Sequence, residues 1–200
     1  MDPLIRPDLP TDPLLLFRRW FENAAAQGLE NPEAMTLATA SAAGRPNARM
    51  VLLKAYDRRG FVFYSNYQSQ KAAELAANPY AALVFYWRGI RRQIRISGLV
   101  NRTSTARSDA YWYSRSRGSQ LSAAASPQSQ PVSDRATLEA RIEALDARYA
   151  DQPIPRPAHW GGYLLTPDSY EFWQNGHHRL HDRFRYVREQ RGWRVERLAP

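Results

Sequence analysis

The 200-residue chain has 44% hydrophobic and 24% charged residues, a composition that fits one soluble globular domain with a sizeable core. It contains no cysteine, which excludes disulfides, thiol nucleophiles and cysteine-ligated metals. The net charge of +9 favours an anionic partner, but the arginines are scattered rather than gathered in one tail, and this argues against nucleic acid.

The N-terminal half is predicted to contain two helices and five strands. Residues 1–10 are expected to be loose and residues 11–200 to form a single domain. Asp12 is the expected N-cap of the first helix, with Pro13 at the first helical position and Gly28 near its end. Strands are predicted at residues 34–42, 47–57, 61–66, 80–87 and 92–100, and a short helix at 69–77. Short turns join the first three strands, so these should be antiparallel neighbours.

The C-terminal half is predicted to begin with helices and to return to strands. Residues 104–117 and 119–125 have helical composition, and a clearer helical period follows Ser133. A proline-rich linker is predicted at residues 152–157. Strands are predicted at residues 162–165, 169–174, 183–188 and 193–198. The sequence therefore predicts a mainly β fold with α-helices, an antiparallel barrel or sandwich with helices packed outside.

No targeting or membrane segment is visible in the sequence. No apolar run approaches the ~20 residues that a membrane-spanning helix needs. The first residues lack a basic region followed by an apolar one, which a secretory signal requires. We therefore expect no membrane partner, and cytoplasm is the default location.

One predicted strand carries a cation on each of its faces. Side chains alternate along a strand, so Arg49, Val51 and Leu53 share one side, and Met50, Leu52 and Lys54 share the other. Each cation could hold a phosphate. The alternative is an exposed arginine and a lysine that only marks the strand end.

Hydroxyls, amides and an ammonium gather at a predicted strand-to-helix junction. Tyr64-Ser65-Asn66 ends the strand, and Ser69-Gln70-Lys71 opens the helix. Backbone N–H groups at a helix start favour an anion. No glycine-rich phosphate loop is present, and a plain capped helix is the alternative.

A second candidate anion site lies in the predicted helix after residue 104. Tyr111, Arg115 and Ser119 are spaced i, i+4, i+8, which places them on one helix face. A phenol, a guanidinium and a hydroxyl in a row can grip a phosphate. A solvated face would explain Arg115 equally well, but not Tyr111.

Residues 171–183 pack two aromatics, three histidines, two arginines and two acids into thirteen positions. Arg179, His181 and Arg183 alternate, so on an extended backbone they would share one anion-receptive face, with Leu180 turned inward. His177 and His181 at i, i+4 suggest a metal, but the HExxH pattern is absent and Arg179 would repel a cation, so we expect no metal. Hydrolase motifs are absent.

Taken together and in this order, these motifs resemble the pyridoxine/pyridoxamine 5′-phosphate oxidases, FMN enzymes of vitamin B6 metabolism. The resemblance runs from about residue 10 to residue 200. It is carried by Arg49-Met-Val-Leu-Leu-Lys54, Phe63-Tyr-Ser-Asn66, Ser69-Gln-Lys71, Arg92-Gln93, Tyr111-x3-Arg115-x3-Ser119, Gln128-Ser129, Glu171-Phe-Trp-Gln-x-Gly-x-x-Arg-Leu-His-Asp-Arg183 and Trp193-x3-Arg197-Leu-Ala-Pro200. Each motif is weak alone, and the ordered set is specific.

The resemblance implies an FMN-binding split β-barrel that is antiparallel and Greek-key-like, in a homodimer with FMN at the subunit interface. It implies oxidation of pyridoxamine or pyridoxine 5′-phosphate to pyridoxal 5′-phosphate by O2, releasing H2O2, and NH3 from the amine. The implied FMN contacts are Arg49, Met50, Val51, Leu52, Leu53, Lys54, Tyr64, Ser65, Gln70, Lys71, Gln93, Gln128, Ser129, Trp173 and Arg183. The implied substrate contacts are Lys54, Tyr111, Arg115, Ser119, Arg179, Leu180 and His181, with Arg179 and His181 as catalytic residues.

One departure from the family pattern and two alternatives remain. The family usually has arginine where this chain has Gln70, so an amide would replace one cationic contact to the flavin phosphate. An FMN oxidase of phenazine-type metabolism is the first alternative, although its substrates lack the phosphate that Lys54 and Arg115 would hold. A flavin- or heme-binding split barrel without turnover is the second, and it would leave Arg179 and His181 without a role.

Overall fold

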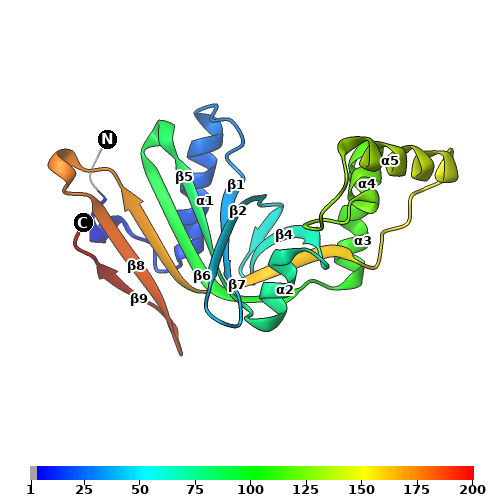
Figure 1. Cartoon of the computed structure of the whole chain (residues 1–200). Helices are drawn as coiled ribbons and strands as arrows, with labels where there is room; N and C mark the ends of the chain where they lie inside the picture. Colours follow the sequence, from blue (N-terminus) through cyan, green and yellow to red (C-terminus); the bar gives the residue numbers. More distant parts are fainter. Residues whose placement is uncertain (1–3) are drawn as a thin grey trace.

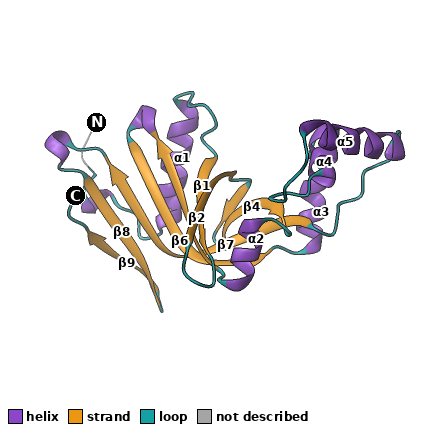
Figure 2. Ribbon diagram, viewed as in Figure 1, coloured by secondary structure: helices purple, strands orange, loops and turns teal. Residues whose placement is uncertain are grey.

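The computed structural model describes residues 4–200, and within them nine strands form one antiparallel sheet. The strands are β1 (Ala34–Ala40), β2 (Pro46–Leu52), β3 (Ala55–Asp57), β4 (Gly60–Asn66), β5 (Tyr80–Trp87), β6 (Arg92–Arg102), β7 (Trp160–Gln174), β8 (Asp182–Glu189) and β9 (Gly192–Arg197). The helices are α1 (Pro13–Ala26), α2 (Gln70–Ala77), α3 (Thr105–Tyr113), α4 (Arg117–Ala125) and α5 (Arg135–Tyr149), with short 3-10 turns η1 (Arg6–Asp8), η2 (Arg88–Ile90) and η3 (His177–Arg179). Figure 2 shows the helices outside the curled sheet, as the sequence predicts.

The sheet order is β2-β1-β5-β6-β7-β4-β3, with β8 and β9 continuing from β7 as a separate wing. Pairs such as β1 with β5 and β4 with β7 join strands far apart in the chain, as a Greek-key-like arrangement requires. The sheet curls so that its two ends approach, and Lys54 N–H donates to the carbonyl of Val62 at 2.8 Å where β2 passes into β3. The result is a half-barrel, which confirms the predicted split-barrel class (Figure 1).

Helix α1 closes one side of the main core. Asp12 accepts a hydrogen bond from Leu14 N–H at 2.9 Å and Pro13 occupies the first turn, as the sequence indicates. Phe17 is fully buried and packs edge-on against Phe61 and Phe85, with ring centroids 4.8 and 5.3 Å away. None of the described helices is long and apolar enough to span a membrane.

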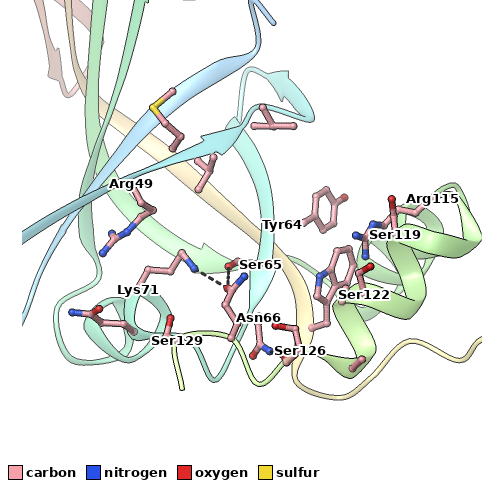
Figure 3. A pocket seen from close by; sticks show the side chains of 18 of the residues that line it. Arg49, Tyr64, Ser65, Asn66, Lys71, Arg115, Ser119, Ser122, Ser126 and Ser129 are labelled. Atoms are coloured by element: carbon pink, nitrogen blue, oxygen red, sulfur yellow. Dashed lines mark hydrogen bonds between the residues drawn. The ribbon is translucent and has the colours of Figure 1, made fainter. Parts of the chain in front are cut away.

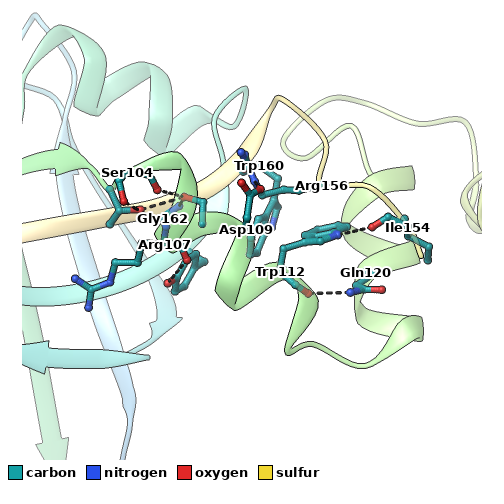
Figure 4. A network of polar contacts seen from close by, with 12 residues as sticks. Ser104, Arg107, Asp109, Trp112, Gln120, Ile154, Arg156, Trp160 and Gly162 are labelled. Carbon is teal, nitrogen blue, oxygen red and sulfur yellow. Dashed lines mark hydrogen bonds and ion pairs between the residues drawn. The ribbon is translucent and has the colours of Figure 1, made fainter. Parts of the chain in front are cut away.

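Helices α3, α4 and α5 form a helical arm that projects to the right of the sheet in Figure 1. A second, smaller core of Trp112, Leu121, Ile154 and Trp160 holds this arm together. Trp112 Nε1 donates to the carbonyl of Ile154 at 2.8 Å, and Gln120 Nε2 donates to the carbonyl of Trp112 at 2.8 Å (Figure 4). Trp160 begins β7, so its place in this core ties the arm to that strand.

Three sequence predictions about element bounds differ from the structure. The strand predicted at 47–57 is divided between β2 and β3. The helix predicted over 104–117 ends at Tyr113, because Ser116 caps a new helix, α4. The strands predicted at 162–165 and 169–174 are one strand, β7, whose register shift opposite Ser97/Gly98 accommodates an extra residue.

The chain start is also better anchored than predicted. Residues 1–3 lie outside the described part of the chain. Leu4 N–H donates to Asp182 at 3.0 Å, and its carbonyl accepts from Arg197 at 3.0 Å. Tyr186 donates to the carbonyl of Pro10 at 2.9 Å. The segment from Leu4 onward is therefore tied to the β8–β9 wing, a long-range contact that local composition does not reveal.

Candidate functional site

A cavity of about 1100 Å³ opens between the half-barrel and the helical arm. Figure 3 shows Arg49 and Lys71 at one end, with Arg115 and Ser119 at the other. Most of the predicted site residues line it: Arg49, Met50, Val51, Leu52, Lys54, Tyr64, Ser65, Gln70, Lys71, Tyr111, Arg115, Ser119, Gln128 and Ser129. Leu53 does not, because it is 5% exposed and packs into the main core.

Lys71 anchors the first end of the cavity. Its Nζ donates to Gln128 Oε1 at 2.8 Å and to Ser69 Oγ at 3.1 Å, while Ser65 Oγ donates to the same Gln128 oxygen at 3.3 Å. Burial and, secondarily, the charge of Arg49 lower the pKa of the Lys71 ammonium to about 8, against the opposing effect of Glu74. This end therefore combines a buried cation with hydroxyl and amide groups, a donor set suited to a phosphate.

Arg49 is already ion-paired, which the sequence prediction of a free strand cation missed. Its Nη2 lies 3.2 Å from Glu74 Oε2, and its Nη1 donates to the Thr39 hydroxyl and to the carbonyl of Leu37. The cavity nevertheless includes Arg49 in its wall. Glu74 lies three residues after Lys71 on α2, and that spacing places it near the cavity cations but does not signal its pairing with Arg49.

Stacked aromatic rings form the opposite wall. Tyr64 and Tyr111 stack with centroids 3.9 Å apart, and Arg115 lies 4.7 Å from the Trp160 ring and 5.2 Å from Trp112. Burial raises the pKa of both tyrosines, so each phenol keeps its proton at neutral pH. Arg115 Nη1 is buried and has no hydrogen-bond partner within residues 4–200. Such an orphaned donor is costly unless an anion meets it.

Ser119 lines the Arg115 end of the cavity from α4 rather than from the helix that carries Tyr111. Tyr111, Arg115 and Ser119 do not lie along one helix face, because Tyr111 belongs to α3 and Ser119 to α4. Ser116 caps α4 at the break between the helices and donates to Ser119 Oγ at 2.9 Å. The prediction of one shared helix face is wrong, yet all three side chains line the same cavity.

A second group of predicted residues lies outside the cavity, on three neighbouring strands. Gln93 pairs with Trp173, and Trp173 pairs with Arg183, so the three form one row on one face of the sheet. Tyr86 pairs with Gln93 and extends this row onto β5. Tyr86 and Trp173 also line a separate hollow of about 560 Å³. The sequence analysis missed Tyr86, although the hairpin of β5 and β6 places it opposite Gln93.

Within the row, the Arg183 side chain is held in place by Glu171 and by the backbone carbonyl of Ala199. Arg183 Nε and Nη2 donate to Glu171 Oε1 at 3.0 and 2.8 Å. Arg183 Nη1 donates to the carbonyl of Ala199 at 2.7 Å. Glu171 is buried, and its other oxygen accepts from Arg95 at 3.1 Å. The guanidinium therefore has a defined orientation before any ligand is considered.

The turn that carries Arg179 and His181 is not extended. His178 and Arg179 have φ values of 51° and 65°, so the predicted alternation on one face is wrong. Leu180 is 73% exposed, whereas the sequence placed it inward. His181 Nδ1 accepts from Gly176 N–H at 3.2 Å, and its ring lies 4.6 Å from Trp173. In its neutral form His181 therefore carries its proton on Nε2.

Comparisons with known proteins place the chain in a family. The family described as "Pyridoxamine 5′-phosphate oxidase" matches residues 21–149, and "Pyridoxine 5′-phosphate oxidase C-terminal dimerisation region" matches residues 160–200. The pyridoxine/pyridoxamine 5′-phosphate oxidase of Gluconobacter oxydans is 52% identical over 99% of this chain and 98% of its own. The protein of the same name from Rubrobacter xylanophilus is 53% identical over 94% of this chain and 87% of its own.

Solved structures agree with this placement. PhzG from Burkholderia lata, solved with tetrahydrophenazine-1-carboxylic acid, is 34% identical with a TM-score of 0.94, covering 100% of this chain and 99% of its own. An FMN-binding, pyridoxamine 5′-phosphate oxidase-related protein from Nostoc punctiforme has a TM-score of 0.72 at 20% identity, covering 92% of this chain and 97% of its own, and so supports the fold alone. The chain therefore belongs to the pyridoxamine 5′-phosphate oxidase family.

Proposed function

We propose that the protein is an FMN-dependent oxidase that converts pyridoxamine or pyridoxine 5′-phosphate to pyridoxal 5′-phosphate. Oxygen is the electron acceptor and leaves as H2O2, and the amine substrate also releases NH3. The observation that carries this proposal is a single cavity with an anion-receptive group at each end, around Lys71 and around Arg115. One end suits the phosphate of FMN and the other the phosphate of the substrate. The names of relatives at 52% and 53% identity support the same reaction.

The donors at the Lys71 end fit FMN. Arg49 and Lys71 supply positive charge, while Ser65, Gln128 and Ser129 supply neutral polar groups for phosphate oxygens. Bound FMN supplies the two-electron acceptor for oxidation of the C4′ carbon of the substrate. The protein's contribution is to hold that carbon against the flavin ring, which is catalysis by positioning.

The Arg115 end fits the substrate phosphate. The buried Nη1 of Arg115 points to an anion, and Tyr111, Ser119 and Lys54 line the same cavity. Because the phenol of Tyr111 stays protonated, it can donate along with the two cations. Four groups suit a tetrahedral phosphate with several acceptor oxygens. An oxidase of the phenazine type remains the second candidate, since PhzG is 34% identical to this chain.

We also propose that the active site is completed by a second copy of the chain. The row of Gln93, Trp173 and Arg183 lies outside the cavity of its own protomer. The family match at residues 160–200, which is described as a dimerisation region, contains Trp173, Arg183 and the turn with Arg179 and His181. In a homodimer, the row of one protomer would cover the flavin in the cavity of its partner.

The test is peroxide release by the purified, FMN-loaded protein. We expect peroxide with pyridoxamine 5′-phosphate and far less with unphosphorylated pyridoxamine at the same concentration. If the protein binds no added FMN, the proposal that it is an FMN-dependent oxidase is wrong. One that binds FMN but oxidises only unphosphorylated ring substrates, such as a reduced phenazine carboxylate, would support the second candidate instead.

A further inference from the structure

Glu74 on α2 is a buried carboxylate that receives donors from two strands of the sheet. It is 6% exposed. Its Oε2 accepts from the Thr39 hydroxyl at 2.5 Å and from Arg49 Nη2 at 3.2 Å, and its Oε1 accepts from Asn47 Nδ2 at 2.5 Å. Thr39 lies on β1, whereas Asn47 and Arg49 lie on β2. One carboxylate thus ties α2 to both strands beside the cavity.

Glu74 keeps its negative charge in this place. Burial alone would raise the pKa of its carboxyl, but the hydrogen bonds from Thr39, Arg49 and Asn47 outweigh burial and lower it. A buried ionised group is tolerated when it is paired and fully hydrogen-bonded, as here. The carboxylate is therefore a fixed anion that contacts Arg49 and lies three residues after Lys71 on α2.

The same contacts fix the guanidinium of Arg49. Its Nη2 meets Glu74, and its Nη1 meets Thr39 and the carbonyl of Leu37. An arginine side chain has many rotamers in solution, and holding it in one orientation before a ligand arrives reduces the entropy lost on binding. Gln70 carries no charge, so the two nearby cations, Arg49 and Lys71, carry the attraction for an anion at this end.

We propose that Glu74 is a positioning residue for the phosphate of the cofactor. It acts through Arg49, which lines the cavity and whose guanidinium it holds in one orientation, and it offsets the repulsion between Arg49 and Lys71 so that both stay close together. This inference rests on the proposed function, in which the phosphate of FMN occupies the Lys71 end.

The test is a double-mutant cycle on FMN binding. FMN is titrated into apoprotein, and binding is followed by quenching of flavin fluorescence, for the wild type, Glu74→Gln, Arg49→Met and the double variant. We expect Glu74→Gln to weaken FMN binding about tenfold, and to add less than about twofold once Arg49 is methionine, because contacting residues are coupled. Riboflavin, which lacks the phosphate, should bind the wild type and Glu74→Gln equally well.

Two further variants sharpen the cycle. Thr39→Val removes the hydroxyl shared by Glu74 and Arg49 while keeping the carboxylate, and it should weaken FMN binding in the same direction. Glu139→Gln makes the same chemical change in a surface pair with Arg135, and it should leave FMN binding unchanged. Unchanged FMN binding in Glu74→Gln, or losses that add fully with Arg49→Met, would overturn the inference. A wild type that binds no FMN would instead overturn the proposed function.

Discussion

Arg183 donates from both Nε and Nη2 to one oxygen of Glu171, which fixes its guanidinium in the row beside Trp173. The other oxygen of Glu171 meets Arg95, so one buried carboxylate serves two arginines on opposite neighbouring strands. The row lies outside the cavity of its own protomer, and this separation has a consequence that mixed dimers can test.

We expect two inactive variants to complement each other in one dimer. Arg115→Met disables a cavity and Arg183→Met disables a row, so each homodimer should lose most of its activity. A heterodimer purified through two different tags has one cavity and one row intact, and these belong to different protomers. If they meet across the interface, about half of the wild-type activity returns, because one of two sites is whole. Activity no higher than that of the two homodimers would show that each site is built within one protomer.

Replacement of Arg115 should separate phosphate recognition from flavin binding. A lost hydrogen bond to a charged group is worth about 1.5–3 kcal/mol, so Arg115→Met should lower kcat/KM for pyridoxamine 5′-phosphate by about 10- to 150-fold. FMN affinity should hardly change. The control is Arg117→Met, since Arg117 pairs with Asp146 on the surface of the arm. Equal losses for phosphorylated and unphosphorylated substrates would contradict a phosphate role for Arg115.

FMN affinity should depend on pH through Lys71. Burial, with a smaller contribution from Arg49, lowers the pKa of Lys71 to about 8 in the free protein, and Glu74 partly opposes this. The phosphate binds the ammonium, so affinity should be flat below this pH and fall as pH rises through it, by up to about tenfold per unit. The fall should level off above the pKa of Lys71 in the complex, which the phosphate raises. FMN titrations from pH 6.5 to about 9.5 measure this, and Lys71→Met should bind weakly at every pH without the decline.

Arg179 and His181 should differ in their effect on substrate oxidation. Arg179 keeps its charge throughout and should orient the substrate ring, whereas His181 is engaged by Gly176 N–H and packs beside Trp173. We therefore expect Arg179→Met to lower kcat/KM more than His181→Asn, with FMN retained in both. Rapid mixing of each variant with substrate without oxygen isolates flavin reduction. Loss of that step in His181→Asn alone would instead make His181 an essential base.

Local signals were enough to predict most of the elements. The cap at Asp12, the short turns and the alternation from Arg49 to Lys54 depend on neighbours in the chain, and the structure confirms them. The helix predicted over 104–117 was extended past its end at Tyr113 because serine, as at Ser116, is compatible with both a helix interior and a cap. The positive φ at Arg179 was missed because arginine rarely adopts the left-handed conformation and its residue type does not signal such a turn.

The site was only partly predictable for a similar reason. Motif residues such as Lys71 and Arg115 could be named, but their partners come from elsewhere in the chain. Glu74 meets Arg49 only after α2 packs against β1 and β2, and Tyr86 joins the row of Trp173 only through strand register. Long-range pairing of this kind depends on tertiary packing rather than on composition.

The bond from Arg183 to the carbonyl of Ala199 links the segment that follows β9 to a side chain that we propose lies beside the flavin of the neighbouring protomer. A substitution that displaces this carbonyl would therefore free one nitrogen of the guanidinium without touching a residue of the cavity wall. Such a protein should hold the flavin less tightly while keeping its fold.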